Sequence, residues 1–314
     1  MTQVTCKPWG NLPKHGQVDL WTLQSPQVQV EVLTFGAIIR SVRCEGTGGQ
    51  VDDVVLGFDD LEGYVSDKRY FGAVVGRVAN RVARGRFEVD GKTYQLDINN
   101  GPNALHGGLR GFSKALWLAK EVASGVKMSL CSPDGDQGYP GEMQVSVTYT
   151  LQTASTISDH EVSINAQFYL PVDETSIPTG EIKTVDGSSF DLRQPVLIGP
   201  RLKKVPGGRF DHNFCLSLPE DPWTERHVAR VYHPASGRIL EVSTSQPGVQ
   251  FYTANFLDGS ITGKGGVKYG KHSSFCLETQ NWPNAINQAS FPDCLLGPGE
   301  EYRHLSCFTF TSAK

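Results

Sequence analysis

Residues 144–151 alternate between apolar and polar side chains. Val145, Val147, Tyr149 and Leu151 are apolar, and a serine and two threonines separate them. Successive side chains of a β-strand point to opposite faces, so this period of two predicts a strand with one buried and one exposed face.

Asp90 and Gly91 stand between two short runs of alternating apolar residues within 86–96. An Asp-Gly pair in such a place favours a two-residue turn, so a β-hairpin is predicted there. Further strands are predicted at residues 28–35, 38–42, 161–170, 238–243, 248–254 and 302–311.

Helical periodicity is nearly absent from the chain. Only short turns are predicted, at residues 59–63 and 282–287, and the 34 glycines and 18 prolines are spread over the whole length. Many short strands at such spacing predict an all-β fold. For 314 residues we favour a single large antiparallel β-sandwich of two curved sheets, with a ligand on its concave face. Two ordinary domains would also fit the length.

Composition excludes several classes of function. The chain is 39% hydrophobic and 20% charged, with a formal net charge of −4. Without a basic excess or a polybasic run, binding to nucleic acid or to anionic lipid is not expected. No apolar run approaches the length of a membrane span. The first ten residues lack a hydrophobic signal core, so we expect a cytoplasmic rather than a secreted protein.

Seven cysteines are scattered over the chain without any CxxC pair. Their odd number and their positions in apolar runs favour buried free thiols over disulfides or a zinc site. The sequence also contains no Walker A, GxGxxG, HExxH or GxSxG motif, so nucleotide, zinc-peptidase and serine-hydrolase chemistry have no support. We expect no metal.

An acidic residue interrupts an apolar run in FCLETQNWP, residues 275–283. An ionised carboxylate needs a partner in such surroundings, so Glu278 requires an explanation. A carboxylate beside amides and an indole suits a sugar, which offers hydroxyl groups and C–H faces. A buried glutamate paired with an arginine explains the pattern equally well.

Three other segments carry side chains that suit hydroxyl groups. Asn80 and Arg81 adjoin in GRVANR, where a surface arginine on a loop is the alternative. His106 precedes two glycines in NALHGG, where it would donate to or protonate a substrate oxygen, or simply end a strand before a turn. Asp211 lies in FDHNF, where it would accept from two sugar hydroxyls or stabilise a turn.

Gln250 lies between Val249 and Phe251 in QPGVQFYT. The strand period puts its amide on the face opposite to these two apolar neighbours. That face is either a concave surface for a sugar or the solvent side of the strand.

Together these segments resemble the aldose 1-epimerase family, in particular its vertebrate galactose mutarotase branch. The matching motifs are GRVANR, NALHGG, FDHNF, QPGVQFYT and FCLETQNWP, with YLPVDET and NFLDG between them. The resemblance covers nearly the whole chain, and it implies that residues 1–314 form one domain. It also implies an antiparallel β-sandwich of the supersandwich type, a monomer, a free hexose as small-molecule substrate and no cofactor.

The resemblance implies an isomerase of carbohydrate metabolism that interconverts the α and β anomers of galactose and glucose. Glu278 would be the general base that takes the proton from the C1 hydroxyl. A family histidine protonates the ring oxygen, after which the ring opens, the C1–C2 bond rotates and the ring closes again. The substrate-binding residues would be Asn80, Arg81, His106, Asp211 and Gln250.

The chain departs from the family at one place. The family carries an Asn-His pair followed by a small hydroxyl residue and Tyr-Phe-Asn-Leu, and this histidine is its general acid. Here Leu151 is followed directly by Gln152 and the residues up to Asp159 and His160. Asp159 and His160 match the part of the family sequence that comes just after the motif. About two central strands, on the order of thirty residues, are therefore missing between Leu151 and Gln152. We expect reduced activity and stability, with His106 as a poor substitute acid.

Two other functions stay open. A chain that keeps the hydroxyl-binding side chains but lacks the acid could bind hexoses without turnover. A relative that acts on hexose 6-phosphates would need a cationic pocket, for which Arg77, Arg84 and Arg86 are available.

Overall fold

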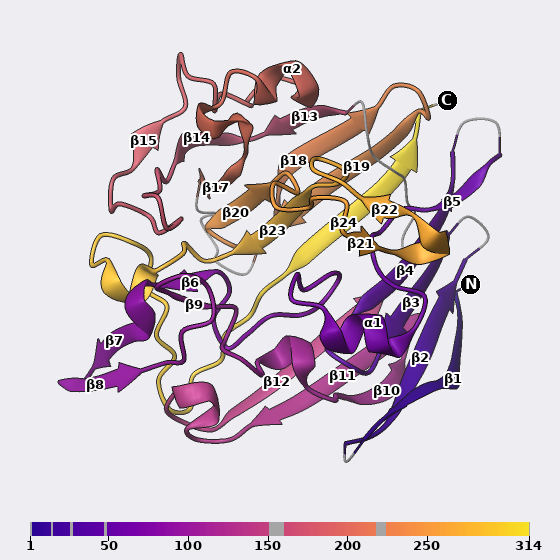
Figure 1. Cartoon of the computed structure of the whole chain (residues 1–314), viewed down its shortest axis with the longest axis horizontal. Helices are drawn as coiled ribbons and strands as arrows, with labels where there is room; N and C mark the ends of the chain where they lie inside the picture. The colour runs from indigo at the N-terminus through magenta and orange to yellow at the C-terminus, as the bar shows by residue number, and fades with distance from the viewer. Residues whose placement is uncertain are drawn as a thin grey trace.

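The computed structural model describes residues 2–13, 15–25, 28–46, 49–150, 160–217 and 224–313. Strands dominate the fold (Figure 1), and every strand pair in these residues is antiparallel. The α-helices are α1 (Leu61–Ser66) and α2 (Ile198–Leu202). The expected all-β sandwich with few short helices is therefore confirmed. No helix in the described ranges is both long and apolar enough to cross a membrane.

Five strands form the first sheet in chain order: β1 (Gln3–Leu12), β2 (Gly16–Gln24), β3 (Val28–Leu33), β4 (Ile39–Glu45) and β5 (Val51–Asp53). Strands β3 and β4 confirm two of the predicted strands. Between them Gly36 and Ala37 have positive φ, 64° and 47°. A Cβ on Gly36 would lie 2.4 Å from the carbonyl oxygen of Ser113, so this turn requires glycine.

A three-stranded sheet follows, made of β10 (Leu118–Val122), β11 (Gly125–Ser132) and β12 (Met143–Thr150). Along β12 the exposed and the partly buried residues alternate without a break, which confirms the half-buried strand predicted from the sequence. The junction between Leu151 and Gln152, where the sequence indicates a deletion, lies outside the described residues.

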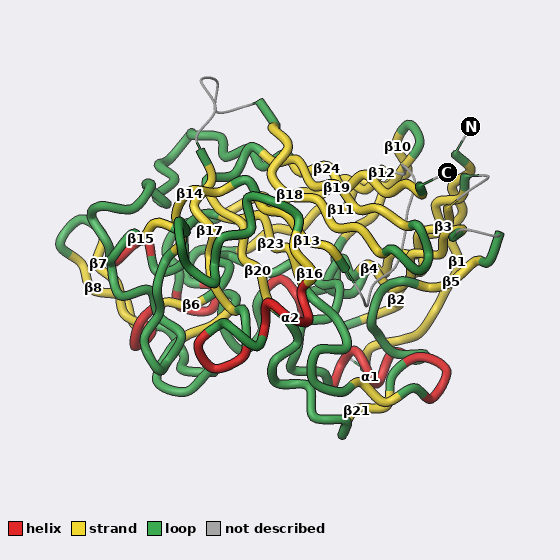
Figure 2. The backbone as a smooth tube through the Cα atoms, turned by 90° about the horizontal axis from the view of Figure 1, so that it is seen from above, coloured by secondary structure: helices red, strands yellow, loops and turns green. Residues whose placement is uncertain are grey.

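Two five-stranded sheets enclose the largest hydrophobic core, to which both contribute. One has the order β16 (Val196–Leu197), β13 (Glu161–Ile164), β18 (Arg226–His233), β19 (Arg238–Thr244) and β24 (Ser306–Ser312). The other has the order β15 (Lys183–Thr184), β14 (Ala166–Tyr169), β17 (Asp211–Leu216), β20 (Gly248–Tyr252) and β23 (Cys276–Gln280). Most of the short helical segments lie below these strands in Figure 2.

The prediction of one continuous strand at residues 161–170 is wrong. The segment forms two strands, β13 and β14, which belong to different sheets. Asn165 lies between them, and its backbone N–H donates to the carbonyl of Val228 at 2.8 Å. Val162, Ile164 and Ala166 are all buried in the same core. Because both halves face that core, the hydrophobic period continues across the point where the chain changes layer.

Shorter elements complete the fold. The strand pairs are β6 (Arg81–Val82) with β9 (Ala104–Leu105), β7 (Arg86–Val89) with β8 (Lys92–Gln95), and β21 (Ile261–Thr262) with β22 (Lys268–Tyr269). The 3₁₀ turns are Ala83–Gly85, Phe112–Lys114, Asp136–Gly138, Pro206–Gly208, Lys264–Gly266 and Ala285–Asn287. Between β7 and β8, Asp90 and Gly91 both have positive φ, 52° and 73°, so the predicted hairpin is confirmed.

The cysteines are all free, but the expectation that they are buried is wrong for most of them. Cys44 and Cys215 are buried and Cys307 is partly exposed, whereas the other four are exposed: Cys6, Cys131, Cys276 and Cys294. A cysteine in a strand-like run points to either face, and the sequence period alone did not show which face is covered.

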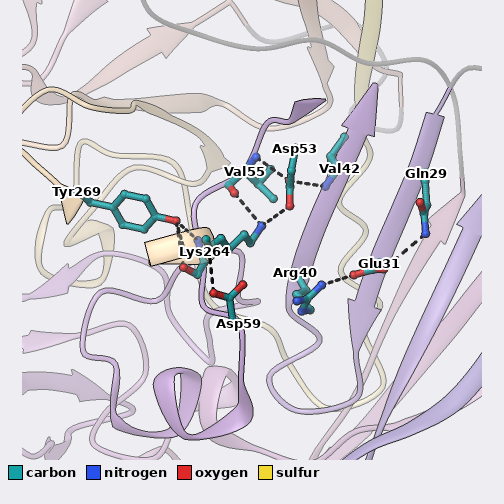
Figure 3. Close-up of polar contacts among 11 residues, drawn as sticks. Gln29, Glu31, Arg40, Val42, Asp53, Val55, Asp59, Lys264 and Tyr269 are labelled. Atoms are coloured by element: carbon teal, nitrogen blue, oxygen red, sulfur yellow. Dashed lines mark hydrogen bonds and ion pairs between the residues drawn. The ribbon is translucent and has the colours of Figure 1, made fainter. Parts of the chain in front are cut away.

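Lys264 ties the turn between β21 and β22 to the first sheet (Figure 3). Its ammonium group donates to Asp53 Oδ2 and to the carbonyl of Val55, both at 2.8 Å. The Tyr269 hydroxyl donates to the carbonyl of Gly57 at 3.1 Å. These bonds fix the long connection between β20 and β23, the two strands that carry Gln250 and Glu278.

Replacing Lys264 with Met should lower the free energy of unfolding by about 1–3 kcal/mol. Asp53 would still accept hydrogen bonds from the backbone N–H groups of Val42 and Val55. Its partly buried carboxylate would, however, lose the ammonium group of Lys264 as its charged partner. Chemical denaturation should compare Lys264→Met with Lys268→Met, because Lys268 is exposed on the same hairpin. Equal midpoints for the two variants would contradict this role of the ion pair.

Candidate active site

A row of polar side chains crosses the sheet that contains β17, β20 and β23. In its register Asn213 lies opposite Gln250, and Gln250 lies opposite Glu278. Cross-strand partners in an antiparallel pair point to the same face, so the three side chains are neighbours. Asp211 and Gln280, each two residues along its strand, belong to the same face.

The other face of these strands packs into the core. Four of its apolar side chains are each at most 8% exposed: Phe214, Val249, Phe251 and Leu277. This arrangement confirms that Gln250 points away from its two apolar neighbours. Gln250 is 4% exposed, so the polar face is covered at this residue and Gln250 does not face solvent.

Asp211 and Gln250 are joined by a hydrogen bond within this face. Gln250 Nε2 donates to Asp211 Oδ1 at 2.8 Å, and both side chains are buried. The remaining amide oxygen of Gln250 and both amide atoms of Gln280 have no hydrogen-bond partner among the described residues. An unpartnered buried polar group costs about 1–3 kcal/mol, so water or the hydroxyl groups of a ligand would complete this face.

Sequence reasoning did not single out Asn213 or Gln280. Both stand in quoted motifs, and the strand period would have pointed to them, because Gln280 is two residues beyond Glu278 and Asn213 two beyond Asp211. Only the register, however, brings Asn213 opposite Gln250.

The short pair β6–β9 positions Asn80, Arg81 and His106. The backbone N–H of Asn80 donates to His106 Nδ1 at 3.1 Å, and the N–H of His106 donates to the carbonyl of Asn80 at 3.0 Å. Arg81 donates through Nη1 to Asn80 Oδ1 at 3.2 Å and through Nε to Asn100 Oδ1 at 2.9 Å. The guanidinium and the imidazole are therefore held by the same few residues.

Gly107 explains why the histidine motif contains glycine. A Cβ on Gly107 would lie 1.7 Å from the carbonyl oxygen of Gly76. The backbone after His106 thus passes close to the GRVANR segment, which only glycine permits. His106 itself has a φ of 50°, and its ring lies 4.7 Å from that of Tyr70.

His106 is a neutral imidazole in this setting. Burial, together with the charge of Arg81, lowers its pKa to about 3. Since Nδ1 accepts a backbone hydrogen bond, the ring proton resides on Nε2, where it can donate to an oxygen atom of a ligand.

Glu278 has the opposite shift. Burial and the neighbouring charge of Asp211 raise its pKa to about 7, and the guanidinium of Arg81 limits the rise. Its side chain is partly exposed, and its carboxylate accepts no hydrogen bond from the described residues. A carboxylate with a pKa near neutral and free lone pairs is suited to accept a proton from a ligand.

Two hollows adjoin this region. One, of about 360 Å³, is lined by Asp173, Arg209 and Asp211 among others. The second, of about 750 Å³, shares Asp173 with the first and is also lined by Arg84 and Arg86. Of the predicted site residues, only Asp211 lines either hollow.

Arg77 does not contribute to a phosphate pocket. Its guanidinium donates to Ser132 Oγ, to the carbonyl of Ser132 and to the carbonyl of Pro140, each at 2.9 Å. These bonds tie GRVANR to the turn after β11. Of the three arginines considered for a 6-phosphate, Arg84 and Arg86 alone line a hollow.

Two other histidines lie outside the polar face. His212 alternates with Asp211 and contacts the rings of Tyr169 and Phe190 on the core side, so the two do not form an acid–imidazole pair. His160 is buried and stacks on His233 with ring centroids 4.7 Å apart.

Comparison with known proteins agrees with this geometry. The family model described as aldose 1-epimerase matches residues 19–158 and 152–309. The chain belongs to the aldose 1-epimerase family. It is 50% identical to the galactose mutarotase of Bos taurus over 345 aligned positions, which cover the whole of both chains. The aldose 1-epimerase of Escherichia coli K12 is 33% identical over 321 positions, 90% of this chain and 91% of that one.

Solved structures of this family have the same fold. A GalM/aldose epimerase homologue from C. elegans superposes with a TM-score of 0.85 at 26% identity, and all of both chains is covered. The galactose 1-epimerase of Lactobacillus acidophilus NCFM gives a TM-score of 0.80 at 23% identity with the same coverage. The described residues thus have the fold of these structures.

The raised pKa of Glu278 predicts how stability depends on pH. Its folded-state pKa of about 7 exceeds the ordinary value of 4.5, so stability is greatest below the ordinary value and falls as pH rises through the folded-state value. Glu278→Gln should remove this fall and should be more stable than the parent above neutral pH by on the order of 2 kcal/mol.

Urea denaturation at about pH 4.5 and pH 8 measures this difference. The matched control is Glu88→Gln, which removes an exposed carboxylate from β7. The same pH dependence in the parent, in Glu278→Gln and in the control would contradict the assignment.

Proposed function

We propose that this chain interconverts the α and β anomers of free hexoses such as galactose and glucose. The observation that carries the proposal is that Glu278 has a raised pKa and a carboxylate without a hydrogen-bond donor among the described residues. Its carboxyl has a pKa of about 7, accepts no hydrogen bond from the described residues and lies in one row with Gln250. The bovine relative that is named a galactose mutarotase supports the choice of substrate.

In the proposed reaction Glu278 takes the proton from the anomeric hydroxyl. The C1–O5 bond breaks, C1 becomes an aldehyde carbon, and O5 receives a proton from an acid on the other side of the ring. Rotation about C1–C2 and closure on the other face return both protons and give the second anomer. No electron acceptor or cofactor is needed for this sequence.

The other residues would hold the hydroxyl groups of the sugar. Asp211 accepts, the guanidinium of Arg81 and the Nε2–H of His106 donate, and the amides of Asn80 and Gln250 can do either. Each is fixed by a partner within the protein, which reduces the entropy lost when the sugar binds.

His106 fits this positioning role better than the role of substitute acid. With a pKa of about 3, its imidazole carries no extra proton to give at neutral pH. We therefore propose that turnover is limited by the lack of a proton donor opposite Glu278.

A deletion would account for that lack. Alignment with the bovine relative runs over 345 positions, whereas this chain has 314 residues. The two matches to the family model overlap at residues 152–158, next to the proposed junction after Leu151. We propose one domain over residues 1–314 from which about two strands are missing.

The same lack favours a second candidate function, a hexose-binding protein without turnover. We also propose a cytoplasmic monomer that binds neither nucleic acid nor membrane. The net charge of −4 and the free cysteines support this.

A coupled assay with α-galactose tests the function. We expect a rate above that of the spontaneous reaction but at least tenfold below that of the bovine relative, rising with pH up to about 7 as Glu278 ionises. Glu278→Gln should reduce the rate to the spontaneous value, and His106→Asn should chiefly raise KM.

Glu88→Gln is again the control, and it should behave as the parent. Calorimetric binding of galactose without any anomer exchange would favour the second candidate. A turnover equal to that of the bovine relative would overturn the proposal of a missing acid.

A further inference from the structure

The polar face of β17, β20 and β23 extends beyond Glu278 on the side away from Asp211. Gln250 and Glu278 are opposite one another in the middle row of this face. The row on one side of it contains Asp211, and in the row on the other side Gly248 is opposite Gln280. Alternate residues of a strand are about 7 Å apart and point to the same face. Gln280 is therefore the next side chain along β23 on that face.

Gly248 lets two amide groups flank the same point of the sheet. A Cβ on Gly248 would lie 2.4 Å from Oδ1 and 2.9 Å from Nδ2 of Asn213. The side chain of Asn213 thus occupies the place where any larger residue would put its Cβ. Because Gln280 is the partner of Gly248 on the other neighbouring strand, no side chain of β20 separates Asn213 from Gln280 at this position.

This part of the face is buried and lacks hydrogen bonds. Asn213 is 1% exposed and Gln280 is 4% exposed. Both amide atoms of Gln280, Oε1 of Gln250 and Oδ1 of Asn213 have no hydrogen-bond partner among the described residues. Buried polar groups are nearly always paired, since an unmade hydrogen bond costs more than an ordinary one contributes. The cluster therefore calls for a ligand group that both donates and accepts.

Burial alone does not leave a glutamine of this fold without a partner. Gln246 is also 4% exposed, and its Oε1 accepts a hydrogen bond from the Tyr302 hydroxyl at 2.6 Å. The amide nitrogen of Gln250 likewise donates to Asp211. The unpaired amide atoms of Gln280 are thus a local feature of the polar face next to Glu278.

We infer that Gln280 is a further substrate-binding residue, which, with the amide oxygens of Asn213 and Gln250, binds a ring hydroxyl at C2 or C3 of the hexose. A hydroxyl group donates one hydrogen bond and accepts others, so it pairs with both the Nε2 and the oxygen atoms of this cluster.

The choice of hydroxyl rests on the proposed function, in which Glu278 takes the proton from the hydroxyl at C1. Gln280 is the neighbour of Glu278 along the strand, so it meets a hydroxyl close to the anomeric carbon. Galactose and glucose have the same configuration at C2 and C3 and differ at C4. Gln280 therefore serves both sugars and discriminates against hexoses that lack the hydroxyl it binds.

Calorimetric binding of galactose and of its 2-, 3-, 4- and 6-deoxy forms tests this assignment. The parent should bind either the 2-deoxy or the 3-deoxy sugar about tenfold more weakly than galactose. Gln280→Met should bind galactose about tenfold more weakly than the parent does and should no longer distinguish it from that deoxy sugar. The ratios for the 4-deoxy and 6-deoxy forms should stay as in the parent. Full discrimination at both C2 and C3 in the variant would overturn the inference.

Stability without sugar separates this role from a structural one. Gln280→Met removes amide atoms that have no partner, so its urea midpoint should equal or exceed that of the parent. The matched control Gln246→Met removes the acceptor of the Tyr302 hydroxyl. It should lower the midpoint and leave the affinity ratios of all five sugars unchanged. A lower midpoint for Gln280→Met together with unchanged ratios would assign the amide to the fold and overturn the inference.

Activity shows which of the two proposals fails. In the coupled assay with α-galactose, Gln280→Met should raise KM about tenfold and leave kcat unchanged, because the hydroxyl is bound equally before and during ring opening. Binding with the expected deoxy pattern but without anomer exchange would support Gln280 and count against the isomerase. Turnover by the parent with the same KM in Gln280→Met would overturn the role of Gln280 and leave the proposed function standing.

Discussion

The register of β17, β20 and β23 is the constraint on which the rest of the candidate site depends. It brings Asn213, Gln250 and Glu278 into one row while Val249 and Phe251 enter the core on the other face. A slip by one residue would exchange the two faces. The hydrophobic core therefore also determines that the polar groups of three separate sequence motifs meet.

Arg81 sets the electrostatic balance of that face. Its charge opposes the rise in the pKa of Glu278 that burial and Asp211 cause, and it adds to the fall in the pKa of His106. The result is a carboxyl group that titrates near neutral pH beside an imidazole that stays neutral. The two groups thus suit different tasks, proton acceptance and hydrogen-bond donation, because of their surroundings.

The polar face reaches β23, the last strand of its sheet among the described residues, and the outer edge of a sheet can expose backbone groups to pairing with other chains. On that strand the amide atoms of Gln280 have no hydrogen-bond partner among the described residues, and Phe308 on β24 is 39% exposed.

Much of the architecture could be predicted from local patterns. The alternation along β12, the Asp-Gly turn between β7 and β8 and the opposed faces of Gln250 and Phe251 depend on strand geometry alone. The β1–β2 hairpin was not expected, because β1 is mostly exposed and contains Pro8 next to an irregularity in the register, so it has little hydrophobic period. Likewise, β13 and β14 appeared as one strand because both face the same core.

The sequence by itself determined that Glu278 is an unusual carboxylate within a β-protein, and its motifs pointed to the family. Only the tertiary structure decided which side chains surround it. The strand period alone places Gln280, two residues beyond Glu278, on the same face. Asn213 and Asp211 reach that face only because hydrogen bonds pair strands that are far apart in the chain. Burial, and with it the pKa of Glu278, is likewise a property of the packed layers, because desolvation depends on every chain segment that covers the group.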